Sequence, residues 1–449
     1  MSVAFVFGRD LRLQDNEALS YAAGLGEDLL PLYIVPGEFD SLSPIRQHSL
    51  VESLRALDAS LPSGLHVMHS SLEDSIASLS GVENIVATRA HDTEGMLWQA
   101  DLAEICYSRG IALELKGSNY AVAPGTIVKD DGSALKVYTP FYKRWLLCGW
   151  DKPFHLDVNV VSWAEVRNRE LPTPSAPPPL KIRAGEAFAL RTFRRFQERA
   201  LSDYSENRNR PDLPGTSHLS HALAHGEIHP RTLLAELGNN EGAEVFRKEI
   251  AWREFYADVL FRNPHTLDDY YEPRFASMRY ADPVSDADKL QAWKDGKTGY
   301  PIVDAAMRQL NQTGWMHNRS RMIVASFLVK DLHFEWQLGA RYFEQKLTDF
   351  DPASNSHGWQ WTAGCGTDAS PYYRVFNPVL QGVKFDPRGE YVRKFVPELR
   401  HIDGAAVHEP WELIDGYAHG YPERIVDHSQ ERDEALRRLA EIKKYLADR

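Results

Sequence analysis

The sequence predicts two domains: an N-terminal α/β domain built on a doubly wound, Rossmann-like parallel sheet, and a C-terminal domain made only of helices. In the first third, short apolar or β-branched runs alternate with helix-like stretches, which is the pattern of parallel strands joined by helices. After a proline-rich stretch, apolar residues recur at helical spacing. The length of 449 residues suits two or three domains.

The N-terminal elements follow from local composition. Strands are expected at Val3–Phe7, Leu29–Val35, Asn84–Thr88 and Ala112–Lys116, and helices over Ile45–Leu61 and Thr93–Ser108. Only Gly8 separates the first strand from Arg9 and Asp10, so the glycine-rich turn of a dinucleotide-binding site is missing. A ligand at these strand ends would have to be held in another way.

The composition changes at Pro172–Pro179, where five prolines rule out a helix or a central strand. We therefore expect an α/β domain over residues 1–125, a linker over 126–187 and a helical domain over 188–449. The helices expected beyond the linker are Phe188–Leu201, Leu219–Leu237, Val245–Leu260, Val303–Leu310, Arg321–Leu332 and Ala435–Leu446. The last carries an apolar stripe, expected to pack on the body, of Leu436, Leu439, Ile442 and Leu446.

The overall composition is that of a soluble globular protein, with 43% hydrophobic and 25% charged residues. The N-terminal run Met1–Phe7 lacks the basic flank of a signal peptide, so a cytoplasmic location is expected. Cys106, Cys148 and Cys365 are far apart and predict neither a disulfide framework nor a metal site. The net charge of −12 argues against coating by a polyanion, yet it leaves room for a local basic face.

Residues 299–376 carry two unusual runs, Trp315–Met322 and Asn355–Trp361. If the first is helical, Trp315, Asn318 and Met322 share one face, which is an odd face for a simple core. In the second, Trp359 and Trp361 are two apart and point about 200° from each other on a helix. One ring can then line a cavity while the other leads away from it.

These runs resemble the photolyase/cryptochrome family. Gly299–Arg308, Trp315–Met322 and Asn355–Arg374 are similar to its motifs, looking most like the class I cyclobutane pyrimidine dimer photolyases, and Phe7–Arg12 matches the family's opening. The resemblance covers the whole chain. It implies an antenna domain, a long linker and an FAD-binding helical domain. It also implies a deoxyribodipyrimidine photolyase, which repairs pyrimidine dimers in DNA when reduced FAD is excited by light.

The residue types suit that chemistry. A cyclobutane between stacked pyrimidines offers no acidic proton and no carbonyl for a nucleophile, so an electron must be delivered instead. The damaged bases must also be flipped into a pocket with aromatic walls. By resemblance, the residues that contact the lesion are Glu249, Trp252, Asn318, Arg319, Met322 and Trp361.

A second set resembles the flavin contacts. Gly215–Ser220 offers hydroxyl and N–H groups at an expected helix start, which favours phosphate. Phe246 stands where a tryptophan is common in the family, and Arg321 is expected to pair with Asp349. The flavin contacts implied by resemblance are Tyr204, Thr216, Ser217, Leu219, Ser220, Phe246, Arg253, Asn318, Arg321, Asp349, Asp351 and Asn355.

Asn355 distinguishes between relatives. Facing flavin N5, an asparagine accepts a hydrogen bond and gives up no proton, whereas plant cryptochromes carry an aspartate there. Photolyases for the 6-4 photoproduct use two histidines, at places that match Asn318 and Met322 here. Repair of cyclobutane dimers is therefore favoured, with Asn355 and Glu249 among the catalytic residues. The alternative is a cryptochrome-type blue-light photoreceptor with the same fold and flavin.

The family's electron-hopping chain, which reduces oxidised flavin, is matched by Trp359 and Trp336. Its third tryptophan has no direct match, and we expect Tyr280 to act as the surface donor. DNA contact is expected from a ring of cations: Arg191, Arg194, Arg195, Arg208, Arg210, Arg247, Lys248, Arg319, Arg374, Arg388, Arg393 and Lys394.

The antenna chromophore is the least readable feature. The run Arg89–Met96 does not reproduce the glutamate pattern of folate-binding relatives. An 8-hydroxy-deazaflavin is preferred over methenyl-tetrahydrofolate, with a flavin or an empty pocket left open. UV-damaged DNA with a flipped lesion is the expected partner, no protein partner is required, and a monomer is expected.

Overall fold

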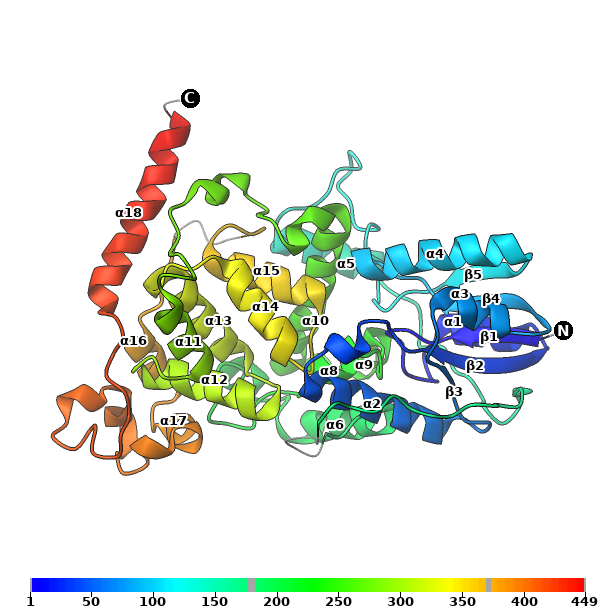
Figure 1. Ribbon diagram of the computed structural model, residues 1–449, viewed down its shortest axis with the longest axis horizontal. Coiled ribbons are helices and arrows are strands. Elements are labelled where there is room, and N and C mark those ends of the chain that lie inside the picture. Colours follow the sequence, from blue (N-terminus) through cyan, green and yellow to red (C-terminus); the bar gives the residue numbers. More distant parts are fainter. Residues whose placement is uncertain (1, 177–181, 369–372, 448–449) are drawn as a thin grey trace. The chain divides into compact units, whose positions relative to one another are not determined.

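The computed structural model describes residues 2–176, 182–368 and 373–447, and for 443–447 the backbone alone (Figure 1). It separates into two compact units, Met1–Ser202 with Ser217–Pro264, and Asp203–Thr216 with His265–Arg449. Parts of three predicted features lie outside the described residues: Pro177–Pro179 of the linker, residues 369–372 of the last motif, and the side chain of Leu446. The predicted domain boundaries stay a prediction.

The first unit contains a five-stranded parallel sheet in the order β3-β2-β1-β4-β5. Its strands are β1 (Ser2–Val6), β2 (Asp28–Ile34), β3 (His66–Met68), β4 (Val82–Thr88) and β5 (Ala112–Lys116). In the register at the centre, Val3 pairs with Leu29 of β2 and with Asn84 of β4. The doubly wound α/β fold class is confirmed, although the sequence did not reveal the three-residue edge strand β3.

Alternation along the strands builds two apolar layers, one on each face of the sheet. Val3 and Phe5 point into a core with α1 (Glu17–Gly24) and α2 (Pro44–Ser60). Ala4 and Val6 point into the other, with α3 (Leu72–Ser78) and α4 (Thr93–Arg109). In Figure 1, the helices α2 and α4 lie on opposite sides of the strands. A parallel sheet needs this double cover because both of its faces are apolar.

The other α-helices described for the first unit are α5 (Tyr138–Cys148), α6 (Glu186–Arg199), α8 (Ser220–Ala224), α9 (Pro230–Glu236) and α10 (Glu241–Arg262). The single helix predicted over Leu219–Leu237 is wrong, since α8 and α9 are separate. Gly226 between them has φ +67°, and a Cβ there would come within 2.0 Å of the Arg9 carbonyl oxygen. The turn therefore needs glycine.

The second unit is all helical around one core. It contains α7 (Tyr204–Asn207), α11 (Ala287–Asp295), α12 (Pro301–Thr313), α13 (Asn318–Ser326), α14 (Trp336–Lys346), α15 (Pro352–Ala363), α16 (Pro378–Phe385), α17 (Glu390–Phe395) and α18 (His428–Ala447). Short 3-10 turns are η1 (Phe39–Ser41) in the first unit, η2 (Pro264–Leu267) at the boundary, and η3 (Pro273–Ser277), η5 (Pro397–Leu399), η6 (Gly404–His408) and η7 (Pro410–Glu412) in the second.

The predicted helix Arg321–Leu332 differs from the structure at both ends. Helix α13 begins at Asn318 with His317 as its cap, so Trp315 lies before the helix and does not share a helical face with Asn318 and Met322. At its other end α13 continues into a π-helical turn, η4 (Phe327–Asp331). The Leu332 N–H donates to the Phe327 carbonyl, five residues back, at 3.0 Å.

The stripe on α18 is partly used for packing. Ile442 is buried and Leu439 packs on the core, whereas Leu436 is 38% exposed. Among the described residues, no helix is long and apolar enough to span a membrane.

Candidate functional site

A groove of about 680 Å³ in the second unit gathers three of the predicted lesion contacts. Arg319 and Met322 reach it from α13, and Trp361 reaches it from α15. The loop 373–377, α16 and the first turns of α18 supply its other described walls. Asn318 is exposed at the start of α13 and does not line the groove.

Arg319 is held in a defined orientation at this groove. Its guanidinium donates to Asn209 Oδ1 at 2.8 and 3.3 Å and lies over the Phe385 ring, 4.5 Å from the centroid. Burial lowers the pKa of Arg319, and the nearby charge of Arg208 lowers it further. The side chain is thus a desolvated cation that gains strongly from an anionic ligand.

The groove is positively charged although the chain is acidic overall. Its described lining contains four cations, Arg319, Arg374, Lys384 and Arg432, and no acidic residue. Lys384 and Arg432 were not among the predicted DNA contacts. None of the other predicted cations lines the described groove, and four of them pair with carboxylates: Arg210 with Asp212, Arg247 and Lys248 with Glu244, and Arg388 with Glu390.

The wall formed by loop 373–377 is anchored from beneath. Lys330 of η4 donates to the Arg374 carbonyl at 2.6 Å, with its ammonium 4.3 Å from the Tyr373 ring centroid. Ser326, one turn earlier, accepts from the Phe376 N–H at 3.3 Å. Burial lowers the pKa of Lys330 to about 7. The helix that carries Arg319 and Met322 therefore also fixes the wall beside them.

Two further lesion candidates, Glu249 and Trp252, lie on α10 in the first unit. Tyr138 of α5 stacks face to face on Trp252, with centroids 3.7 Å apart and planes 7° apart. The Tyr138 hydroxyl donates to the Lys248 carbonyl at 2.7 Å, which fixes the ring. Tyr138 was not among the predicted site residues, because no local signal joins it to a residue more than a hundred positions away.

Helix α10 is tied to α5 and to the chain that follows β5 by a buried carboxylate. Glu254 accepts from the main-chain N–H groups of Ala121 and Val122 at 2.5 and 3.1 Å, and from the Trp145 indole at 2.5 Å. Burial raises the pKa of Glu254 to about 7 despite these donors. The contacts fix the helix on which Trp252 stands.

In the second unit, the predicted pair of Arg321 and Asp349 is present. The guanidinium donates to Asp349 Oδ2 at 2.6 Å and to the Met316 carbonyl at 2.9 Å. Asp349 is buried, and its other oxygen, Oδ1, has no hydrogen-bond partner within the described part of the chain. Leaving a buried carboxylate oxygen without a hydrogen-bond donor costs free energy. Such an oxygen therefore indicates a position where a ligand can donate to it.

Asn355 has its amide orientation fixed by α14. Its Nδ2 donates to the Ala340 carbonyl at 3.1 Å, so Oδ1 is the atom left to accept from a ligand. Asp351 caps α15 by accepting from the Ser354 N–H at 2.8 Å. Tyr204 is buried at the start of α7, under Arg208.

The other flavin candidates belong to the first unit, except Thr216, the last residue of a second-unit segment. Helix α8 starts only at Ser220, with Leu219 at its cap position and no side-chain cap, so Thr216 and Ser217 do not cap it. His218 between them and the helix has φ +53°, a rare conformation for a residue other than glycine. The expectation of a helix start in Gly215–Ser220 holds only at its last residue.

Phe246 and Arg253 of α10 have structural contacts of their own. The Phe246 ring packs on Phe193 and Phe196 of α6, at 6.4 and 5.0 Å between centroids. The Arg253 guanidinium donates to the carbonyls of Asn119 and Leu223 at 3.3 and 3.2 Å. Arg253 thereby holds α8 against the chain that follows β5.

The aromatic chain begins in the core of the second unit. Trp359 is 3% exposed, and its ring lies against Gly339, one turn along α14 from Trp336. The Trp336 ring is edge-on to Tyr270, with centroids 6.3 Å apart. Tyr270 in turn stacks with Tyr280 at 6.3 Å and 19°. Tyr270, which was not predicted as a site residue, thus stands between Trp336 and the expected donor.

The strand ends of the sheet are closed by polar networks. Asp10 accepts from the Gly8 N–H and Thr88 Oγ1, both at 2.7 Å, and so bridges the carboxyl ends of β1 and β4. These two strands flank the point where the sheet order reverses, which is the usual ligand site of this fold. A carboxylate there disfavours phosphate, in keeping with the missing glycine-rich turn.

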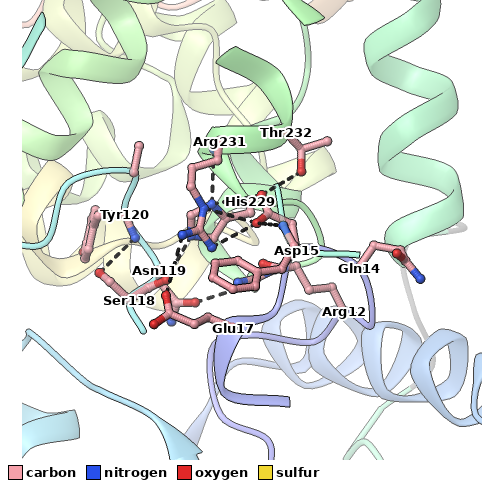
Figure 2. A network of polar contacts seen from close by, with 12 residues as sticks. Arg12, Gln14, Asp15, Glu17, Ser118, Asn119, Tyr120, His229, Arg231 and Thr232 are labelled. Carbon is pink, nitrogen blue, oxygen red and sulfur yellow. Dashed lines mark hydrogen bonds and ion pairs between the residues drawn. The ribbon is translucent and has the colours of Figure 1, made fainter. Parts of the chain in front are cut away.

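A second network lies just after Asp10 (Figure 2). Asp15 accepts from Arg231 Nε at 3.1 Å and from the Thr232 hydroxyl at 2.9 Å. His229 Nε2 bonds to the Ser118 carbonyl at 2.9 Å, and its Nδ1 accepts from the Arg231 N–H at 3.1 Å. Because a carbonyl only accepts, Nε2 carries a proton, whereas Nδ1 accepts from Arg231 although Asp15 Oδ2 lies 3.3 Å from it. Burial lowers the pKa of His229 to about 4, which keeps the ring neutral at neutral pH. The network joins the loop after β1, the chain after β5 and α9.

The run Arg89–Met96, considered for the antenna, is engaged in local structure. Asp92 caps α4 by accepting from the Gly95 N–H at 3.0 Å, and burial lowers the pKa of His91 to about 4. Burial, then the neighbouring Glu38, raises the pKa of Glu94. These contacts do not distinguish one antenna chromophore from another.

Models of known protein families match most of this chain. Residues 246–441 match the model of the FAD binding domain of DNA photolyase, and residues 3–158 match the DNA photolyase model. The chain belongs to the photolyase/cryptochrome family. The family predicted from the sequence is therefore confirmed, together with an FAD-binding domain in the helical part.

Relatives within this family match almost the full length. The deoxyribodipyrimidine photo-lyase of Vibrio cholerae is 37% identical over 96% of this chain and 97% of its own. Among solved structures, a class III photolyase from Agrobacterium tumefaciens is 36% identical, with a TM-score of 0.89 over 99% of this chain and 98% of that one. The predicted enzyme class is confirmed at this level, while membership of class I stays a prediction.

Two other solved structures of the family are more distant in sequence. A Sulfolobus tokodaii photolyase with two FAD molecules is 27% identical, with a TM-score of 0.84 over 98% of this chain and all of that one. A Synechocystis cryptochrome is 28% identical, with a TM-score of 0.85 over 97% and 98%. Repair enzymes and a cryptochrome thus share this fold.

Proposed function

We propose that the protein repairs cyclobutane pyrimidine dimers in DNA by light-driven electron transfer. The observation that carries the proposal is the groove, where Met322 and Trp361 stand among four cations, Arg319 being one of them, and no carboxylate is present in the described lining. An aromatic ring beside an apolar thioether suits stacked, uncharged pyrimidines. The cations suit the flanking phosphates, because DNA binding is dominated by contacts to its backbone.

The residues of the second unit fit a flavin. Asn355 keeps Oδ1 as an acceptor for a ligand, and an N–H donor such as that of reduced flavin N5 complements it. Asp349 has an unused buried oxygen beside the Arg321 cation, so the pair can hold a polar ring edge. Bound and excited by light, reduced FAD supplies the electron that opens the cyclobutane ring. The flavin contacts Tyr204, Thr216, Ser217, Leu219, Ser220, Phe246, Arg253, Asn318 and Asp351 are part of the proposal.

The preference for cyclobutane dimers over the 6-4 photoproduct rests on the absence of two histidines. Asn318 and Met322 stand where repair of the 6-4 photoproduct calls for histidines, and neither donates a proton as an acid. Glu249 and Trp252 are proposed as further lesion contacts. With Tyr138 covering one face of Trp252, only the other face is left for a base.

A repair assay tests the proposal. The reduced protein is illuminated with an oligonucleotide that contains a thymine dimer, and the return of the thymine absorbance band is followed against a dark control. Recovery in the light alone is expected. If the band does not return while flavin is reduced and DNA is bound, repair is refuted in favour of a photoreceptor, which the likeness to the Synechocystis cryptochrome makes the second candidate.

A binding assay tests the groove by itself. Affinity for dimer-containing DNA is expected to fall steeply with salt, because bound cations displace condensed counterions. Replacing Arg374, whose side chain is exposed at the groove, by Gln is expected to reduce the slope of log affinity against log salt by about one. An affinity that is independent of salt would contradict the assignment.

The antenna and the assembly state complete the proposal. An 8-hydroxy-deazaflavin is proposed as second chromophore, and the absorbance spectrum of the purified protein separates it from methenyl-tetrahydrofolate, from a second flavin such as the Sulfolobus relative contains, and from an empty pocket. A monomer is proposed, and light scattering tests it.

A further inference from the structure

The aromatic rings beyond Trp336 are arranged differently from the sequence expectation. Tyr280 was expected to follow Trp336 directly, yet Tyr270 is the ring that contacts Trp336, and Tyr280 lies beyond it. Tyr270 is 4% exposed and sits in the same core as Trp336 and Trp359. An electron leaving the surface for Trp336 therefore meets Tyr270 on the way.

The two phenols differ in what can receive their proton. A tyrosine that loses an electron becomes a strong acid, so its oxidation is lasting only if the hydroxyl proton has an acceptor. The Tyr270 hydroxyl donates to Glu335 Oε1 at 3.1 Å. The Tyr280 hydroxyl donates to the Phe275 carbonyl at 3.1 Å and also bonds with the Tyr270 hydroxyl, and neither of these partners is a carboxylate. A carboxylate is a base, and a main-chain carbonyl is not.

We infer that Tyr270, with Glu335 as its proton acceptor, is the electron donor that ends the chain, and that Tyr280 is not. The inference rests on the proposed function and specifies its electron supply. Burial raises the pKa of Tyr270 well above its ordinary value, so at rest the phenol keeps its proton and does not become a phenolate.

The step balances without a further reagent. With FAD bound, oxidised and excited by light, Trp359 would supply it with one electron, and Trp336 would refill Trp359. Oxidised Trp336 then takes one electron from Tyr270, whose O–H bond breaks. The proton passes to Glu335 Oε1, which leaves a neutral tyrosyl radical and a neutral carboxylic acid. Glu335 is exposed, so the acid exchanges its proton with water.

Three variants and a matched control separate the two tyrosines. Tyr270→Phe keeps the ring and removes the oxidisable hydroxyl, and Glu335→Gln keeps a hydrogen-bond acceptor and removes the base. Tyr280→Phe tests the earlier expectation. Tyr271→Phe is the control. Tyr271 is the next residue, and among the described residues Trp336 has its edge-on ring contact with Tyr270 and not with Tyr271.

The readouts are the tyrosyl radical, followed by electron paramagnetic resonance and transient absorption after a laser flash, and the rate of its formation in D₂O. We expect the radical in the unaltered protein, in Tyr271→Phe and in Tyr280→Phe, forming more slowly in D₂O. It is lost in Tyr270→Phe and Glu335→Gln, where oxidised Trp336 recombines instead.

The opposite pattern overturns the inference. If the radical persists in Tyr270→Phe and disappears in Tyr280→Phe, Tyr280 is the terminal donor, and if Glu335→Gln retains it with an unchanged D₂O effect, Glu335 does not accept the proton. Failure of the proposed function looks different: with its flavin reduced and dimer-containing DNA bound, the unaltered protein then restores no thymine absorbance in the light, whichever radical the flash produces.

Discussion

His229 is expected to make the protein less stable in mild acid. It is 1% exposed, with Nε2 donating to the Ser118 carbonyl and Nδ1 accepting from the Arg231 N–H at the start of α9. Protonation would destroy the Nδ1 acceptor and place a second cation beside Arg231. Burial accordingly lowers the pKa of His229 to about 4, from an ordinary value of 6.5, despite the nearby Asp15.

The sign and the size of the effect follow from proton linkage. Below pH 6.5 the unfolded chain takes up a proton on this histidine that the folded chain refuses until about pH 4. The contribution is therefore fully present above pH 6.5 and is lost as the pH falls. At about 1.4 kcal/mol per pH unit, it amounts to about 3 kcal/mol between these two values. Asp15, whose pKa is lowered to about 2, stays ionised throughout this range.

Urea unfolding between pH 4 and 7, followed by circular dichroism, measures this contribution. His229→Asn keeps an oxygen to cap α9 but does not titrate, so its free energy of unfolding should depend less on pH, by about 1.4 kcal/mol per unit. His91 and His357 also have a pKa lowered to about 4, so the difference between variants is the quantity to read. His69, which is exposed, gives the control variant His69→Asn. Equal slopes in the unaltered protein and His229→Asn would refute the reasoning.

Three other substitutions test the packing around the site. Gly339→Ala should lower the thermal midpoint, at a cost of about 1–3 kcal/mol, because its Cβ would lie 2.1 Å from a ring atom of the buried Trp359; an unchanged midpoint would contradict that contact. Tyr138→Leu should weaken binding to dimer-containing DNA more than to undamaged DNA in a fluorescence anisotropy titration, since Trp252 loses its stacked support; equal losses would remove Trp252 from the lesion site. Lys330→Met should weaken binding to both DNAs alike, because the groove wall loses its anchor, and unchanged affinities would show that the wall holds without it.

The sequence was a sound guide where local pattern decides the structure. The apolar run Val3–Phe7 was expected to be a strand of a doubly wound sheet, and both faces of that sheet are covered as expected. The opposite directions of Trp359 and Trp361 also follow from helical geometry, since one ring is in the core and the other lines the groove. The pair Arg321 and Asp349 was expected from resemblance and is present.

What the sequence did not reveal depends on contacts between distant residues. Tyr138 reaches Trp252, and Tyr270 reaches Trp336, through packing that leaves no periodic trace in either segment. Helix breaks were missed for a related reason. Gly226 looks like a tolerated glycine in a helical pattern, and only the nearby main chain of Arg9 makes it a turn.

The π-helical turn Phe327–Asp331 limits the insertions and deletions that members of the family can tolerate in this segment. An α-helical residue advances the chain by about 100°, so removing one residue from η4 would turn it into an ordinary α-turn and rotate all that follows. Lys330 would leave the Arg374 carbonyl, and Trp336, a few residues on, would leave Tyr270. One lost codon would thus disturb the groove wall and the electron path together. We therefore expect insertions and deletions among relatives to be rare in this turn. They should occur instead in exposed loops such as the one around Val284.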